Sequence, residues 1–107
     1  MVIDSIPDIL KHKANDIDAL CKKHRVTYLA VFGSATTGRF RADSDLDFLV
    51  TFEGHLSARE KAAAFFGLKQ DIEALFDRPV DLVTKASLTN PYFRDSVLAG
   101  QRLLYAD

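Results

Sequence analysis

Two aspartates separated by one residue carry the clearest chemical signal in this 107-residue sequence. Asp45 and Asp47 lie at the start of an apolar segment typical of a β-strand, in which alternate side chains point to the same face. Two carboxylates held side by side repel each other unless a cation lies between them. Magnesium prefers oxygen ligands and suits such a pair. The spacing therefore predicts a metal site at the start of this strand.

A third aspartate, Asp81, stands inside another apolar segment, VDLV. Burying an unpaired acid there costs free energy, which a metal ion or a hydrogen-bonding partner would offset. Two metal ions bound by three carboxylates would activate an attacking hydroxyl and stabilise a leaving pyrophosphate. We therefore expect Asp45, Asp47 and Asp81 to form one catalytic metal site. The alternative is that each acid only opens a strand or pairs with a structural partner.

Gly33 and Ser34 directly follow a third apolar segment. Glycine lets a phosphate approach the backbone closely, and Ser34 can open a short helical turn whose free N–H groups face an anion. The pair predicts a site for a nucleoside triphosphate. Arg39 and Arg41, in the same polar loop, are further candidates for phosphate contacts, although exposed loop arginines need no ligand.

Periodicity and capping residues predict the elements that must position these side chains. We expect strands at 26–32, 46–52 and 80–83, helices at about 6–24, 57–76 and 90–100, and a final strand or extended tail in RLLYA. The loop between the first two strands has no room for a full crossover helix, so these strands are expected to be antiparallel neighbours. The long helix after the second strand predicts a right-handed parallel crossover to the third.

This topology brings the glycine–serine pair and the three aspartates to one edge of the sheet. The fold class is therefore α/β (α+β): a small mixed sheet of three to four strands flanked by helices, in a single domain over residues 1–107. The proximity of the candidate residues follows from strand order alone and needs no assumption about function.

The composition limits which partners and which cellular location the sequence predicts. With 14 basic and 15 acidic residues, the net charge of −1 disfavours extended binding to nucleic acid, which needs a basic excess. The single cysteine, Cys21, permits no internal disulfide. The chain has no run long enough to span a membrane and no signal-peptide pattern, so a cytoplasmic location is expected.

The segment GSATTGRFRADSDLDF resembles the signature of the DNA polymerase β-like nucleotidyltransferase superfamily, in which Gly-Ser is followed, after ten residues, by Asp-x-Asp. Gly33 and Ser34 match the first pair, Asp45 and Asp47 match the second, and the third family carboxylate falls on Asp81. The small size is similar to that of minimal nucleotidyltransferases. The resemblance implies a polymerase β palm-like fold and transfer of AMP from ATP to a hydroxyl, with two Mg²⁺ ions.

Minimal members of this superfamily commonly act as antitoxins beside an all-helical HEPN-domain toxin, and some transfer AMP to a tyrosine of that toxin. The resemblance implies the same partner here. Many minimal members carry an arginine where this chain has Thr37, so Arg39 or Arg41 must substitute, or the activity is weaker.

Two other functions stay open at this point. One is a non-catalytic antitoxin that neutralises its partner by direct binding. The other, less favoured because the chain offers no second domain for an acceptor pocket, is a small-molecule nucleotidyltransferase. The sequence leaves the base preference, the acceptor and the homo- or hetero-oligomeric state undecided.

Overall fold

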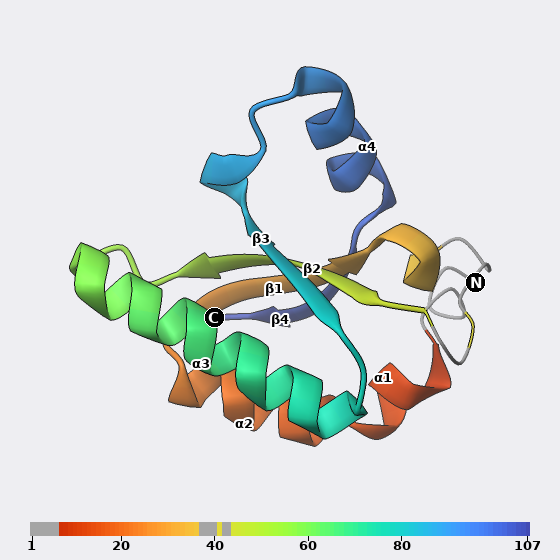
Figure 1. Ribbon diagram of the computed structural model, residues 1–107, viewed down its shortest axis with the longest axis horizontal. Helices are drawn as coiled ribbons and strands as arrows, with labels where there is room; N and C mark the ends of the chain where they lie inside the picture. Colours follow the sequence, from red (N-terminus) through yellow and green to blue (C-terminus); the bar gives the residue numbers. More distant parts are fainter. Residues whose placement is uncertain (1–6, 37–40, 42–43) are drawn as a thin grey trace.

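The computed structural model describes residues 7–36, 41 and 44–107, and it contains a four-stranded mixed sheet in the order β3-β2-β1-β4. Figure 1 shows helices on both sides of this sheet. The elements follow one another as α1 (Asp8–His12), α2 (Ala14–Lys23), β1 (Val26–Phe32), η2 (Gly33–Thr36), β2 (Leu46–Phe52), α3 (Ala58–Phe76), β3 (Val80–Thr84), η3 (Lys85–Ser87), α4 (Pro91–Gly100) and β4 (Arg102–Ala106).

The strand directions are those that the connections predict. β1 and β2 are antiparallel, whereas β2 and β3, which are joined through α3, are parallel. The C-terminal segment RLLYA forms β4, which pairs antiparallel with β1 and completes the sheet on that side. The predicted mixed sheet flanked by helices is therefore confirmed, with four strands.

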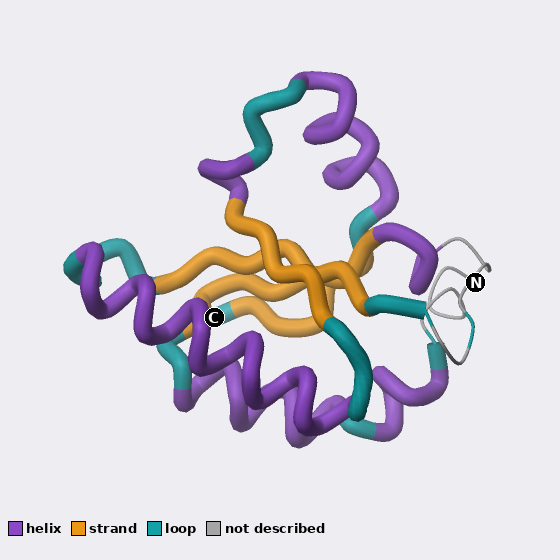
Figure 2. The backbone as a smooth tube through the Cα atoms, viewed as in Figure 1, coloured by secondary structure: helices purple, strands orange, loops and turns teal. Residues whose placement is uncertain are grey.

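One face of the sheet packs against α2 and α3, which run below it in Figure 2. Alternate residues of each strand supply this main core, because successive side chains of a strand point to opposite faces. Leu46, Phe48 and Val50 contribute from β2 and are fully buried, as the alternation predicts. The residues between them, including Asp47, belong to the other face.

The opposite face carries a smaller buried cluster made by Phe32, Leu49, Leu88 and Val97. The last of these comes from α4, which therefore packs on the side of the sheet away from α2 and α3 (Figure 1). The side chain of Asn90 accepts hydrogen bonds from the N–H groups of Tyr92 and Phe93, and Pro91 occupies the first helical position. These two residues begin α4 as predicted, because both suit the unpaired N–H groups of a helix start.

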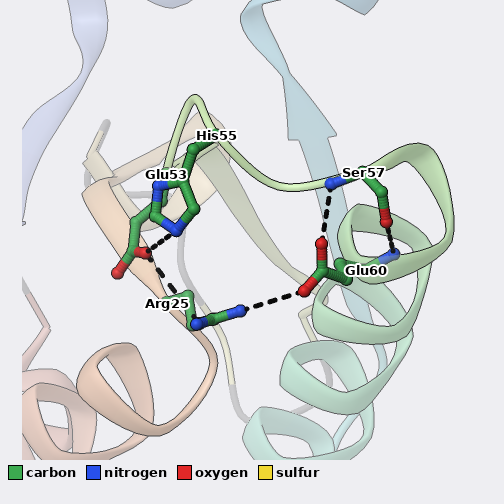
Figure 3. Close-up of polar contacts among 5 residues, drawn as sticks. All are labelled: Arg25, Glu53, His55, Ser57 and Glu60. Carbon is green, nitrogen blue, oxygen red and sulfur yellow. Dashed lines mark hydrogen bonds and ion pairs between the residues drawn. The ribbon is translucent and has the colours of Figure 1, made fainter.

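A polar network far from the aspartates joins three elements (Figure 3). Ser57 and Glu60 form a reciprocal capping box that begins α3. Arg25 follows α2 in the left-handed conformation, with φ of 61°, and its guanidinium lies 3.3 Å from Glu60 and 3.9 Å from Glu53. The network ties the end of α2 to the end of β2 and the start of α3.

The prediction of one continuous helix over residues 6–24 is wrong. The chain forms two helices that meet at Lys13, while residue 6 lies outside the described part. His12, Asn15 and Asp16 are weak helix formers, so little favours a continuous helix here. Leu10 and Ile17 are nevertheless both buried in the main core. Within the described residues, no helix is long and apolar enough to cross a lipid bilayer.

Candidate active site

Strand register places Phe32 and two of the candidate residues, Asp47 and Asp81, in one row across the sheet. Phe32 at the end of β1 lies opposite Asp47 of β2, and Asp47 lies opposite Asp81 of β3. Residues paired across neighbouring strands present their side chains on the same face. This row therefore lies on the face away from α2 and α3, at the edge of the sheet where the sequence predicts the site.

Gly33 lies directly beside the Asp47 carboxylate. Its φ is 76°, and a Cβ atom added to it would lie 2.4 Å from Oδ2 of Asp47. Glycine is needed at this position for both reasons, since other residues adopt this backbone conformation at a cost and would collide with the carboxylate. Ser34 follows in the 3₁₀ turn η2, where the Thr36 hydroxyl donates a hydrogen bond to the Gly33 carbonyl at 2.9 Å.

A cleft of about 400 Å³ opens over this row of residues. Gly33, Thr36, Asp47 and Asp81 line one side of it, together with Phe32. The other side is the face of α4 that carries Phe93, Ser96, Val97 and Gly100. Its volume suits a small-molecule ligand, since such sites have volumes of about 300–1,000 Å³.

The contribution of α4 to the wall of the cleft was not predicted from the sequence. Phe93, Ser96, Val97 and Gly100 belong to no motif, but they recur at the spacing i, i+3, i+4, i+7, which places them on one helical face. The available signal in the sequence was one helix face that carries an aromatic residue, two small residues and a valine. It shows its meaning only once the helix is seen to lie over the aspartates.

Two of the other predicted site residues are not part of the cleft lining. Asp45 precedes β2 and is exposed, as is Arg41, and neither lines the cleft. Arg39 and Thr37 lie outside the described residues. The structure thus brings Gly33, Asp47 and Asp81 together around one cleft, with Asp45 close enough to act on Asp47 through its charge.

Asp47 bears the largest electrostatic strain at the site. Burial, followed by the charges of Asp81 and Asp45, raises the pKa of Asp47 from 3.8 to about 6. A cation would relieve this repulsion, so the donor set fits a hard metal such as magnesium. Among the described residues, no three acidic, histidine or cysteine side chains are arranged to hold an ion by themselves. Magnesium usually takes one or two carboxylates and completes its shell with substrate phosphates and water.

The raised pKa predicts that Asp47→Asn stabilises the metal-free protein at neutral pH. The folded protein binds this proton more tightly than the unfolded chain, so the wild-type free energy of unfolding falls as pH rises from about 4 to 6. Solvent reaches the carboxyl and screens it, so we expect a gain of about 1 kcal/mol, or about 4 °C in melting temperature.

Thermal unfolding in EDTA measures this gain at pH 7.5 and at pH 4. It should be absent at pH 4, where Asp47 is protonated in the wild-type protein, and smaller for Asp45→Asn because Asp45 is exposed. A lower melting temperature for Asp47→Asn at pH 7.5 would instead show that the carboxylate has a structural role.

Arg78 positions the chain that leads into Asp45. Its guanidinium, from the connection between α3 and β3, donates hydrogen bonds to the carbonyl oxygens of Arg41 at 3.3 Å and Ser44 at 3.1 Å. The Ser44 hydroxyl in turn accepts a hydrogen bond from the Arg41 N–H at 2.8 Å. Charged hydrogen bonds of this kind are stronger than neutral ones, so they hold the residue before Asp45 in place.

Two side chains of α3 hold the residue before Asp81 in the same way. Glu73 accepts a hydrogen bond from the Val80 N–H at 3.0 Å, and Lys69 donates one to the Val80 carbonyl at 2.7 Å. The Val80 N–H, followed by the Lys69 ammonium, lowers the pKa of Glu73. Because β3 is an edge strand, these bonds replace those of a missing neighbour and fix the position from which Asp81 projects.

Comparisons with known proteins agree with this geometry. The chain is 37% identical over 89 residues to the protein adenylyltransferase MntA of Thermococcus cleftensis, covering 82% of each protein. A solved structure described as a candidate minimal nucleotidyltransferase is 33% identical, with a TM-score of 0.66, and the match covers 89% of this chain and 92% of that one.

A second solved structure is that of a tri-AMPylated HEPN toxin of Shewanella oneidensis in complex with its MNT antitoxin. The match has a TM-score of 0.62 at 21% identity and covers 92% of this chain and 73% of that one, so it shows a shared fold. The model of the nucleotidyltransferase domain family matches residues 14–104. This match over most of the chain, together with the cleft at Gly33, Asp47 and Asp81, leads to one conclusion: the chain belongs to the nucleotidyltransferase domain family and is a nucleotidyltransferase.

Proposed function

We propose that this protein is a magnesium-dependent adenylyltransferase that moves AMP from ATP to a tyrosine hydroxyl of a HEPN-type toxin and thereby acts as an antitoxin. The observation that carries the proposal is the cleft in which Gly33, Asp47 and Asp81 meet. The backbone at Gly33, which is suited to binding phosphate, and the two carboxylates line the same cleft, as transfer from a nucleoside triphosphate requires.

In the proposed reaction, the tyrosine oxygen attacks the α-phosphorus of ATP and forms a new P–O bond. The bond between that phosphorus and the oxygen bridging to the β-phosphate breaks, and pyrophosphate leaves with the electron pair. Bound magnesium would neutralise charge on the phosphates and on the leaving pyrophosphate. Asp81 accepts the proton of the attacking hydroxyl, because it is exposed at the cleft and available to an incoming side chain.

Different residues bind the ligands. The backbone N–H groups of η2, from Gly33 onward, face the terminal phosphates, as free N–H groups of a helical turn suit an anion. Asp45 and Asp47 would hold the magnesium, which typically binds one or two carboxylates besides substrate phosphates and water. Arg41 and Arg39 are proposed to add contacts to the phosphates when ATP is bound.

The named partner comes from the relatives. The Thermococcus cleftensis relative is named a protein adenylyltransferase, and the Shewanella oneidensis antitoxin of similar fold is bound to an AMPylated HEPN toxin. These names favour a protein acceptor over a small molecule.

The test is AMP transfer to the product of the neighbouring gene, which the proposal expects to be a HEPN-type protein. We expect that incubation with ATP and magnesium adds one or more AMP units to that protein, as measured by mass spectrometry. A small amount of enzyme should modify an excess of partner, since a catalyst turns over. EDTA should abolish the mass gain, because the carboxylates act through a metal ion.

The matched control is the double variant Asp45→Asn/Asp47→Asn, which keeps the shape of both side chains but removes their charge. It should add no AMP and should fail to relieve toxicity in cells. If the double variant relieves toxicity as well as wild type, and wild type adds no AMP, the protein neutralises its partner by binding and the enzymatic proposal is wrong.

A further inference from the structure

The wall of the cleft that faces the aspartates comes from one side of α4. Phe93, Ser96 and Gly100 are each separated by three or four residues, so they share a helix face with the buried Val97. Val97 anchors this face in the small upper core. Phe93, Ser96 and Gly100 line the cleft. The roles proposed for the phosphates and the metal do not involve these three residues.

Phe93 packs against the sheet although about half of its surface is exposed. Its ring packs edge-to-face on Phe32, with centroids 6.2 Å apart and an interplanar angle of 75°. The Asn90 side chain caps the turn that carries it by accepting a hydrogen bond from the Phe93 N–H. Yet 48% of Phe93 is exposed. The exposed Phe93 ring lines the same cleft as the carboxylates of Asp47 and Asp81. Such a cleft suits a ligand with a flat, apolar group at one end and a metal-bound anionic group at the other.

The register tells which part of a nucleotide can reach this ring. Phe93 packs on Phe32, and Phe32 is the cross-strand neighbour of Asp47. Neighbouring strands lie about 5 Å apart, so Phe32 stands one strand away from Asp47, and the Phe93 ring packs 6.2 Å from the Phe32 ring. A nucleotide whose α-phosphate lies at Asp47 and Asp81 would therefore bring its nucleoside next to Phe93.

We infer that α4 provides the nucleoside-binding wall, with Phe93 packing on the base and the Ser96 hydroxyl bonding to the ribose. This inference rests on the proposed function and adds to it the side of the cleft that recognises the nucleoside. Ser96 follows Phe93 by three residues and lines the same cleft, so its hydroxyl lies on the same helix face as the ring and is available to a ligand bound there.

The test compares ATP with inorganic tripolyphosphate, which has the phosphates but no nucleoside. Calorimetry on the full chain with magnesium should show that Phe93→Ala weakens ATP binding about tenfold, since removal of an aromatic stacking partner has effects of this size. Tripolyphosphate affinity should stay at the wild-type value. Phe93→Tyr, which keeps the ring, should retain ATP binding, and Ser96→Ala should weaken it to a smaller extent.

Tyr92→Ala is the matched control, because Tyr92 is the adjacent aromatic residue, is 87% exposed and does not line the cleft. It should bind both ligands as wild type does. Phe93→Leu guards against loss of folding in the alanine variant, and its melting temperature is measured alongside. It should weaken ATP binding while unfolding at a temperature close to that of wild type.

Three results would overturn the inference. Phe93→Ala and Phe93→Leu could bind ATP and transfer AMP as wild type does, or they could lose affinity for ATP and tripolyphosphate equally. They could also bind ATP with wild-type affinity but transfer AMP poorly. The last result would place Phe93 on the acceptor side. Failure of the wild-type protein to bind either ligand with magnesium would instead contradict the proposed function itself, so the two failures are distinguishable.

Discussion

Replacing Asp81 by asparagine is expected to abolish AMP transfer while leaving magnesium-dependent ATP binding close to that of wild type. Asp81 is exposed at the cleft and lies opposite Asp47 in the parallel β2–β3 ladder. In the proposed reaction it accepts the proton of the acceptor, and loss of a general base lowers rates by about 10²–10⁴-fold. In the proposed site, ATP binding depends mainly on Gly33, Ser34 and the Asp45–Asp47 pair.

Mass spectrometry of the partner measures the transfer, and calorimetry measures the ATP affinity. Asp77→Asn is the matched control, since Asp77 caps the end of α3 with φ of 52°, a conformation that asparagine also tolerates. The control should transfer AMP normally. Persistence of transfer in Asp81→Asn would remove the proton-accepting role, and loss of ATP binding would make Asp81 primarily a residue of the nucleotide site.

Gly33→Ala is expected to damage both stability and activity. A β-carbon at this position has to fit a backbone with φ of 76° and would lie 2.4 Å from the Asp47 carboxylate. The backbone conformation alone costs an L-residue about 1–2 kcal/mol, and a displaced carboxylate can lower the rate about 10²-fold. We expect the melting temperature to fall by about 8 °C, with strongly weakened binding of ATP and magnesium.

Gly54→Ala is the natural control, because no heavy atom lies within 4 Å of an added β-carbon there. It should unfold and bind ATP as wild type does. Adding Asp47→Ala to Gly33→Ala removes the collision, so the double variant should regain part of the lost stability without regaining ATP binding. If Gly33→Ala behaves like Gly54→Ala, the close approach of Gly33 to Asp47 has no functional consequence.

Local sequence patterns predicted much of this fold. The strands Val26–Phe32 and Leu46–Phe52 have the bounds that their apolar runs indicate. Ser57 with Glu60, and Asn90 with Pro91, begin their helices through contacts within three residues. Such signals are read correctly because both partners lie in the same short segment. The break at Lys13 was missed because weak helix formers there give no sharp stop signal.

The sequence by itself determined which residues could do chemistry and that they would meet at one edge of the sheet. Alternation put Asp47 on the face opposite to Leu46, Phe48 and Val50, and chain connections made β1–β2 antiparallel and β2–β3 parallel. These properties depend on strand period and loop length, which are local. The tertiary structure decided how deeply each of these candidate residues is buried, because burial depends on neighbours distant in sequence.

Only the fold shows that the Asp47 carboxyl is partly buried and lies near the charges of Asp81 and Asp45, which together raise its pKa. Only the fold brings α4 over the site, so that Phe93 becomes part of the cleft. It also places Arg78 and Glu73 on the residues that precede two of the aspartates. Each of these contacts joins segments separated by at least seven residues, and no periodicity within one segment encodes such a contact.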